Sequence, residues 1–378
     1  MIGNKVFLPI AVLFAIACQA CGASTQTSST TSAPRSSFQK PMLLGLVDMG
    51  SQLSYAKGVS FPTVNLAELG SDYPAFSGIV VNETWAQLEP SSGTYAWNDL
   101  DSSLSAVESF NAEHPSNQLG VKLRIFAGKT APDWAKQLGG SPITLTSKNT
   151  SFTYGRWWSA SYRQAWSKFQ HALASRYDSN PTVRAVAVTS CATLTGEPFI
   201  VGLDPSNIPI LESAGWTPQA QQSCIEGVFS DYSGWVKTPI DFPFNPFRIL
   251  INNRPQVDEA VTNQILEMCA KSKSTGGPLC VVGNHGLSDT ATSGSEGVLY
   301  SEINSLWSAN PNSFSVYFQT IGPNSGADCH SINIAISHHA TSVELWPPAL
   351  NYKGFGSIPI GTLELWNKDL ASSTSLSC

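Results

Sequence analysis

Glu197 stands out in this 378-residue chain because its position suggests chemistry. It lies in the stretch CATLTGEPF (191–199), directly after the apolar run VRAVAVTS (183–190). A carboxyl group at the end of a buried strand can serve as a general acid or base, because its surroundings tune its pKa. The alternative is a loop carboxylate that pairs with an arginine or with a helix N-terminus. The side chains at the other strand ends decide between these roles.

Polar and aromatic side chains also follow the other apolar runs. The candidates that could bind or act on a substrate are Glu83, Trp85, Arg124, Asn253, His285, Gln319, Glu344 and Trp346. Carboxylates perform acid–base chemistry, amide and guanidinium groups bind hydroxyl groups, and aromatic faces stack on sugar rings. Such a set is typical of a carbohydrate site. We interpret Glu344 as the candidate partner of Glu197 and Arg124 as a group that organises carboxylates; Glu344 could instead be a buried structural partner of Arg124 or Lys129.

Eight apolar runs alternate with amphipathic helical patterns and must position these side chains. The runs are 42–50, 76–85, 120–128, 183–190, 247–253, 278–286, 314–322 and 341–348. Continuous apolar runs are typical of parallel strands that are buried on both faces. The pattern predicts an α/β fold, a single-domain (β/α)8 barrel over 41–378, with the site at the carboxyl ends of the strands. The Pro-rich segment 199–246 is predicted to be a long loop over the barrel mouth.

The N-terminal segment is typical of an exported protein. Residues 1–23 contain an apolar run too short to cross a membrane comfortably, which predicts a signal peptide. The stretch AIAC resembles a bacterial lipobox, which would attach a lipid to Cys18, and cleavage at a nearby alanine is the alternative. Residues 24–40 are Ser/Thr-rich and predict a tether. The protein is therefore expected to be secreted, or held at the cell surface or in the periplasm.

Cysteine usage and net charge indicate disulfides and restrict the cofactors and partners that we expect. Six cysteines follow the signal segment, an even number that predicts disulfides in an exported chain. We expect the pairs Cys191–Cys224, Cys269–Cys280 and Cys329–Cys378. The spacing of cysteines and histidines predicts no metal site, and nothing calls for a cofactor. A net charge of −6 without a basic cluster argues against nucleic acid as a partner.

Three motifs resemble a known group of enzymes. The stretches TWAQLEPSSGTYAWNDLD (84–101) and KLRIFAGKTAPDW (122–134) resemble (β/α)8 glycoside hydrolases of the retaining clan that includes bacterial β-galactosidases, cellulases and mannanases. The resemblance implies that Glu197, within Gly-Glu-Pro, is the acid/base. In that clan an asparagine precedes this glutamate, and here it is Gly196. The clan's nucleophile ends the seventh strand, where this chain has Gln319.

A glutamine cannot form a glycosyl ester, so three interpretations stay open. The strand containing VELW could be the seventh strand after all. Glu344 could serve as the second carboxylate from the eighth strand, and a pair on opposite strands favours inversion, which needs the wider spacing of about 6.5–9.5 Å. The chain could also be a non-catalytic carbohydrate-binding barrel on the cell surface. A surface lipoprotein with a structural role is a further alternative.

Overall fold

The computed structural model describes residues 40–49, 60–147, 150–191, 197–198, 205–251, 254–311, 314–322, 328–346, 358–376 and 378. The predicted signal peptide, Cys18 and all but the last residue of the predicted tether lie outside the described residues. Residues Phe38–Cys378 form one compact unit. In the described part of the chain, no helix has the length and apolar character needed to cross a membrane.

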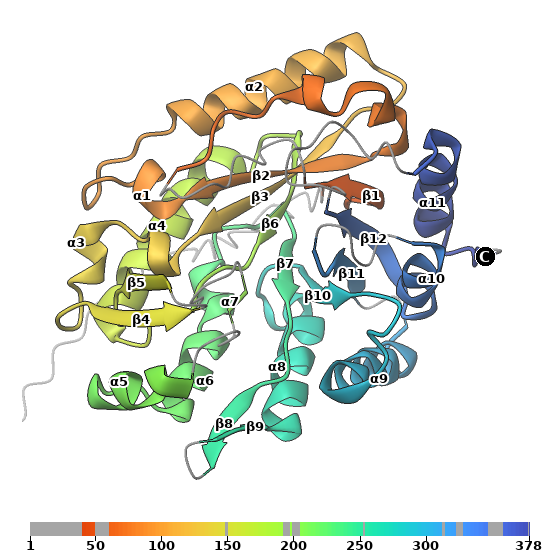
Figure 1. Ribbon diagram of the computed structural model, residues 1–378. Coiled ribbons are helices and arrows are strands. Elements are labelled where there is room, and N and C mark those ends of the chain that lie inside the picture. Colours follow the sequence, from red (N-terminus) through yellow and green to blue (C-terminus); the bar gives the residue numbers. More distant parts are fainter. Residues whose placement is uncertain are drawn as a thin grey trace, which may run out of the picture. The chain divides into compact units, whose positions relative to one another are not determined.

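Eight parallel strands close into a barrel, which confirms the predicted (β/α)8 fold (Figure 1). In the order of the chain they are β1 (Gly45–Asp48), β2 (Gly78–Thr84), β3 (Gly120–Phe126), β6 (Val183–Ala187), β7 (Ile240–Pro243), β10 (Cys280–Leu287), β11 (Ser315–Thr320) and β12 (Ala340–Leu345). The barrel closes where β1 pairs with both β2 and β12. Seven of the eight predicted runs overlap these strands.

The predicted fifth strand, 247–253, is wrong. Its described part is β8 (Arg248–Ile251), which pairs antiparallel with β9 (Arg254–Val257) in a hairpin outside the barrel. The fifth barrel strand is β7, whose sequence IDFP is short and contains a charge and a proline. These features removed the apolar signal from β7, while RILI in the hairpin carried it. Asn253, expected to end a barrel strand, lies outside the described residues.

The predicted loop 199–246 is also more ordered than expected. Its described part holds three short α-helices and the strand β7. The helices are α5 (Ile208–Ser213), α6 (Pro218–Glu226) and α7 (Val228–Asp231), preceded by the 3-10 turn η4 (Pro205–Asn207). Thr217 caps α6, because its side chain accepts a hydrogen bond from the Ala220 amide at 3.1 Å. This added helical segment links the fourth and fifth barrel strands.

The remaining helices lie around the outside of the barrel (Figure 1). They are α1 (Trp85–Leu88), α2 (Asn98–Glu113), α3 (Asp133–Lys136), α4 (Ala160–Tyr177), α8 (Glu259–Lys271), α9 (Gly294–Ala309), α10 (Cys329–Ser337) and α11 (Ile360–Ser372). Short 3-10 turns are η1 (Leu66–Glu68), η2 (Gly70–Ala75), η3 (Gly128–Thr130) and η5 (Lys273–Thr275), and β4 (Ile143–Ser147) pairs with β5 (Thr150–Tyr154) in a second hairpin. Helix α8 begins where Asp258 accepts from the Val261 amide at 3.0 Å.

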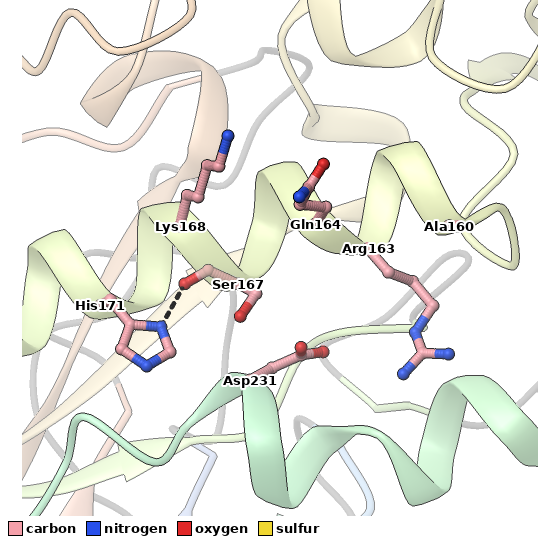
Figure 2. A pocket seen from close by; sticks show the side chains of 7 residues that line it. All are labelled: Ala160, Arg163, Gln164, Ser167, Lys168, His171 and Asp231. Carbon is pink, nitrogen blue, oxygen red and sulfur yellow. Dashed lines mark hydrogen bonds between the residues drawn. The ribbon is translucent and has the colours of Figure 1, made fainter. Parts of the chain in front are cut away.

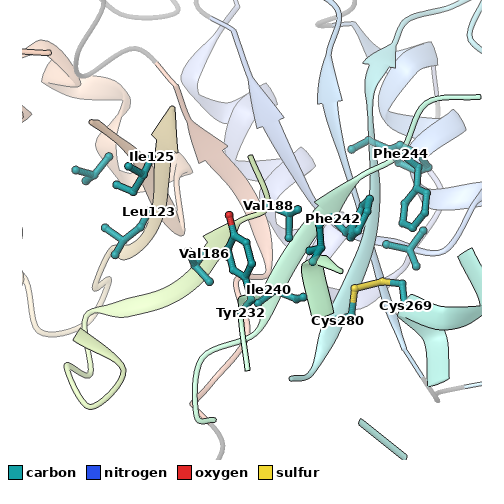
Figure 3. Packing of buried hydrophobic residues seen from close by; sticks show 14 of the residues in the cluster. Leu123, Ile125, Val186, Val188, Tyr232, Ile240, Phe242, Phe244, Cys269 and Cys280 are labelled. Carbon is teal, nitrogen blue, oxygen red and sulfur yellow. A yellow bond between two sulfur atoms is a disulfide. The ribbon is translucent and has the colours of Figure 1, made fainter. Parts of the chain in front are cut away.

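Side chains alternate between the two faces of each barrel strand, and this alternation decides which residues reach the interior. Figure 3 shows part of the main apolar core, which includes Leu123 and Ile125 of β3 and packs toward the helices. A second, small cluster contains Val47, Val80 and Ala185, one residue from each of three barrel strands. Residues that alternate with the main core therefore face the barrel axis.

Three disulfides join the pairs expected from the sequence. Cys191–Cys224 connects the segment after the fourth barrel strand to α6, Cys269–Cys280 connects α8 to β10, and Cys329–Cys378 holds the chain end to α10. All three predicted pairings are confirmed.

Candidate active site

A group of four charged side chains fills the barrel interior. Lys122 and Arg124 come from β3, Asp241 from β7 and Glu344 from β12, and each is at most 5% exposed. The Lys122 Nζ atom lies 2.8 Å from Asp241 Oδ2 and also contacts Glu344 Oε1. The Arg124 guanidinium contacts the other Glu344 oxygen, Oε2. Both oxygens of Glu344 are thus bound by cations, and the expected link between Arg124 and Glu344 is present.

The two cations keep Glu344 ionised. Burial alone would raise the pKa of the Glu344 carboxyl, but Arg124 and Lys122 outweigh burial and lower this pKa to about 2. Burial raises the pKa of Asp241, although Lys122 opposes the shift. Of the two carboxyl groups in this cluster, Glu344 is therefore the one whose negative charge is more strongly stabilised.

Gln319 lies beside Glu344 on the neighbouring strand β11, at the same register. When its amide is turned to the orientation that satisfies both neighbours, the nitrogen donates to Glu344 Oε2 at 3.0 Å and the oxygen accepts from Trp346 Nε1 at 3.2 Å. Trp346 is half-buried and packs against the small apolar cluster that contains Val47, Val80 and Ala185. Because β11 is the seventh barrel strand and β12 the eighth, Gln319 does occupy the seventh-strand position. The interpretation that VELW forms the seventh strand is wrong.

Glu197 reaches the same interior through His285. The His285 Nδ1 atom lies 3.2 Å from Glu197 Oε1, and His285 Nε2 lies 3.1 Å from the Tyr317 hydroxyl. Lys122 Nζ lies 3.6 Å above the centre of the Tyr317 ring. A Cβ atom at Gly283 would overlap that ring, so the glycine makes room for it. Glu197, His285 and Tyr317 therefore form a polar chain that ends at the charged cluster.

The surroundings of His285 favour its neutral form near pH 7. Burial is the main cause that lowers the pKa of its imidazole, and the neighbouring Glu197 opposes the shift. A neutral imidazole carries one donor and one acceptor nitrogen. It can donate to an ionised Glu197 and accept from Tyr317, or accept from a protonated Glu197 and donate to Tyr317. The chain can thus hold a proton on Glu197 without creating a charge on His285.

A third carboxyl group lies near this chain at the start of α9. Burial raises the pKa of Glu296, and the negative charge of Glu197 adds to the shift. Asn284 Nδ2 donates to Glu296 Oε2 at 3.0 Å and to the Phe244 carbonyl at 2.9 Å. Asn284 therefore orients Glu296 rather than facing the barrel axis.

The structure does not bring Glu83 and Trp85 to the interior group. Glu83 lies on the same face of β2 as Ile79 and Val81 of the main core, so it faces the helices. Trp85 is fully buried, and its Nε1 donates to Glu89 Oε2 at 2.7 Å. Within an unbroken apolar run, the sequence carried no alternation from which these directions could be predicted.

Glu83 is a buried carboxyl group without a hydrogen-bond partner among the described residues. Burial, reinforced by the charge of Asp99, raises its pKa to about 8. In the unfolded chain the same group ionises near the ordinary glutamate pKa of 4.5. Folding at neutral pH therefore requires Glu83 to take up a proton. The free energy of unfolding falls as the pH rises from the pKa of this group in the unfolded chain to its pKa in the folded protein.

We expect the Glu83→Gln variant to be more stable than the wild type at neutral pH. The glutamine needs no proton, so the gain in the free energy of unfolding should be on the order of 3 kcal/mol at pH 7. The gain should vanish below about pH 4.5 and level off above about pH 8. Urea denaturation across this range measures it, with exposed Glu113→Gln on α2 as control. Parallel stability curves for the wild type and Glu83→Gln would contradict the assignment.

Sequence reasoning missed several members of the interior group. Lys122 stands two residues before Arg124, and Tyr317 stands two residues before Gln319, so the period of two along a strand could have identified both. Asp241 was missed because its strand was assigned elsewhere. Among the described residues, no group of three histidine, cysteine or acidic side chains is placed to hold a metal ion.

One cavity lies on the outside of the barrel, between α4 and α7 (Figure 2). It has a volume of about 560 Å³ and is lined by Ala160, Arg163, Gln164, Ser167, Lys168, His171 and Asp231. None of these residues belongs to the interior group, and none is a tryptophan, tyrosine or phenylalanine on which a sugar could stack. We therefore place the candidate active site in the barrel interior, where the acidic and basic groups converge.

Comparisons with known proteins agree with the fold. No protein-family model matches the chain, and no curated protein matches it. Among solved structures, endo-glycoceramidase II from Rhodococcus sp. is 15% identical, with a TM-score of 0.50 over 85% of this chain and 78% of that chain. An endogalactoceramidase is 12% identical, with a TM-score of 0.48 over 82% of this chain and 71% of its own.

A third structure is similar over a larger part of this chain. An exo-β-1,4-mannosidase from Opitutaceae bacterium strain TAV5 is 12% identical, with a TM-score of 0.45 over 90% of this chain and 62% of its own. The comparison with endo-glycoceramidase II supports a shared (β/α)8 barrel. The resemblance to barrel glycoside hydrolases is thereby confirmed at the level of the fold.

Proposed function

We propose that this protein hydrolyses glycosidic bonds of an oligosaccharide or polysaccharide, with Glu197 as general acid and Glu344 as the second carboxylate. The observation that carries the proposal is the contrast between the two carboxyl groups. Glu197 lies beside the neutral imidazole of His285, whereas Glu344 is held ionised by two cations. Glycosidases need this division between a proton donor and an ionised carboxylate.

The roles follow from these surroundings. Glu197 would give its proton to the oxygen of the departing sugar, and His285 with Tyr317 would keep it hydrogen-bonded in either protonation state. Glu344 would act on the anomeric carbon, directly as nucleophile or through a water molecule as base. Arg124 would keep Glu344 ionised. Trp346, half-buried next to Gln319, is proposed as a surface on which the sugar ring stacks.

A specific observation favours a second candidate function, carbohydrate binding without catalysis. Gln319 stands at the seventh-strand position and cannot act as a nucleophile. In addition, Lys122, Arg124 and Gln319 already occupy the oxygens of Glu344. In this alternative, Glu344 is a structural anion that neutralises the barrel interior.

We further propose that the protein works outside the cytoplasm. Three disulfides support export, because disulfides persist in oxidising compartments. The signal peptide and a lipid on Cys18 remain part of this proposal. Mass spectrometry of the protein from its native host would identify the mature N-terminus and any lipid on that cysteine.

A panel of glycans tests the activity. The full chain, produced in an oxidising compartment, is incubated with aryl glycosides of both anomers, with oligosaccharides and polysaccharides, and with glycosylceramides. Released reducing ends are measured together with binding to the same glycans. Cleavage of at least one glycan supports the enzyme. Binding without cleavage across the panel would support the binding barrel instead. If no glycan is either cleaved or bound, both functions are contradicted.

A further inference from the structure

The segment that carries Glu197 is held from outside the barrel by one glutamine of α6. The Gln221 amide nitrogen donates to the Pro198 carbonyl at 3.0 Å and to the Cys191 carbonyl at 3.4 Å. Cys191 directly follows the fourth-strand run, and Pro198 is the neighbour of Glu197. One side chain thus bridges the two ends of the segment that leads to the proposed acid.

The other half of the same amide is fixed by two tryptophans. The Gln221 amide oxygen accepts from Trp157 Nε1 at 2.7 Å and from Trp216 Nε1 at 3.2 Å. Both donor hydrogens and both acceptor positions of the amide are therefore used. Turning the amide over would place its NH₂ group against two indole N–H groups, so only one orientation is stable. Gln221 is 2% exposed, so bulk solvent barely reaches these bonds.

A covalent bond reinforces this attachment one helical turn away. Cys224 lies three residues after Gln221 on α6, on the same side of the helix, and forms the disulfide with Cys191. Cys191 has a φ of 58°, a left-handed conformation that residues other than glycine rarely adopt. The disulfide alone ties only Cys191. The far end of the segment, beside Glu197, is tied to α6 through Gln221.

We propose that Gln221 is a positioning residue that sets the location of Glu197 relative to His285, through the Pro198 carbonyl. This inference rests on the proposed function and assigns no substrate contact to Gln221. A glutamine is required because the position needs two donors toward carbonyls and an acceptor toward two indoles. Leucine supplies neither, and glutamate supplies only the acceptor.

The test compares Gln221→Leu and Gln221→Glu with the neighbouring Gln222→Leu. Gln222 bonds to Glu226 at 2.9 Å, away from the Glu197 segment, and serves as the matched control. In both variants at position 221 we expect kcat to fall about 10- to 100-fold while KM stays within about twofold, because a small misplacement of a catalytic group affects mainly the chemical step. Gln221→Glu keeps the acceptor for both tryptophans, so it provides the measurement if the leucine variant fails to fold.

Hydrogen–deuterium exchange provides a second measurement that does not depend on activity. Peptides covering 188–204 should exchange faster in both variants at position 221 than in the wild type and in Gln222→Leu, with the Cys191–Cys224 bond intact by mass. Unchanged exchange, or faster exchange with unchanged kcat, would overturn the proposal. If the wild type cleaves no glycan, the proposed function fails, and the exchange result still decides whether Gln221 holds the segment.

Discussion

Replacing Glu197 with glutamine should lower kcat by about 100-fold or more while leaving glycan affinity nearly unchanged. Glutamine fills the same volume but cannot donate a proton to a departing oxygen, and general acid catalysis commonly contributes 10²- to 10⁴-fold. His285 Nδ1 can still donate to the glutamine oxygen, so the local geometry should survive the change. Turnover of a glycan identified by the panel, together with calorimetric binding of the same glycan, measures both effects.

The choice of leaving group sharpens this experiment. An aryl glycoside with a strongly acidic phenol needs little help from an acid, whereas an unactivated sugar needs much. The loss of activity in Glu197→Gln should therefore be large for oligosaccharides and small for the activated aryl glycoside. The exposed Glu212→Gln on α5 is the matched control and should behave as the wild type. Equal losses on both kinds of substrate would show that Glu197 is not the acid.

Replacing Glu344 with glutamine should both destabilise the protein and stop turnover. The change leaves Arg124 without its carboxylate and Lys122 with Asp241 alone, inside a barrel where neither cation is solvated. Removing one partner of a buried ion pair typically costs about 3–5 kcal/mol. Urea denaturation measures the cost, with exposed Glu364→Gln on α11 as control. A loss below about 1 kcal/mol would contradict the buried ion pairs.

The pH dependence of this loss has a defined sign. The pKa of Glu344 is about 2 in the folded protein and near the ordinary glutamate value of 4.5 in the unfolded chain. A depressed carboxyl pKa contributes stability that is fully present above the unfolded pKa and lost as the pH falls through the folded value. The stability gap between wild type and Glu344→Gln should therefore narrow from about pH 4.5 to about pH 2.

Chemical rescue separates the catalytic role of Glu344 from its structural role. Glu344→Ala leaves space beside Arg124 for a small anion. If Glu344 acts at the anomeric carbon, added azide should restore turnover of an activated aryl glycoside: its nitrogen bonds to that carbon, and the aryloxide leaves. Circular dichroism confirms that the variant is folded. An anion that restores stability but not turnover would make Glu344 a structural partner of Arg124 and favour the carbohydrate-binding barrel.

Much of the fold could be predicted because burial on both faces leaves a plain signal in a parallel strand. Runs such as VKLRIF and VYFQT are apolar enough to stand out between helical patterns. The strand β7 could not be found in this way, since four residues with an aspartate and a proline resemble a loop. The fifth barrel strand was instead assigned to the segment of β8, whose apolar residues belong to a hairpin. The number of strands was nevertheless right, so Glu344 was correctly assigned to the eighth strand.

The sequence predicted which residues belong to the candidate site better than it predicted where their side chains point. Strand order along the chain placed Arg124, His285, Gln319 and Glu344 at one end of a barrel, because parallel strands share their carboxyl edge. The direction of each side chain could not be predicted, since an apolar run gives no alternation to separate the inward face from the outward face. Glu83 was therefore grouped with the site although it faces the helices.

The sequence by itself determined the fold class and the choice of Glu197 and Glu344 as the carboxylates of interest, and it favoured the three disulfide pairs without excluding other pairings. Tertiary structure alone decided that Lys122 and Arg124 hold Glu344 ionised, and that Gln221 bridges Cys191 and Pro198. The physical reason is the distance along the chain over which each property is set. Burial and cysteine count are recorded locally in the chain, whereas pKa values and hydrogen-bond partners depend on groups that meet only when the barrel closes.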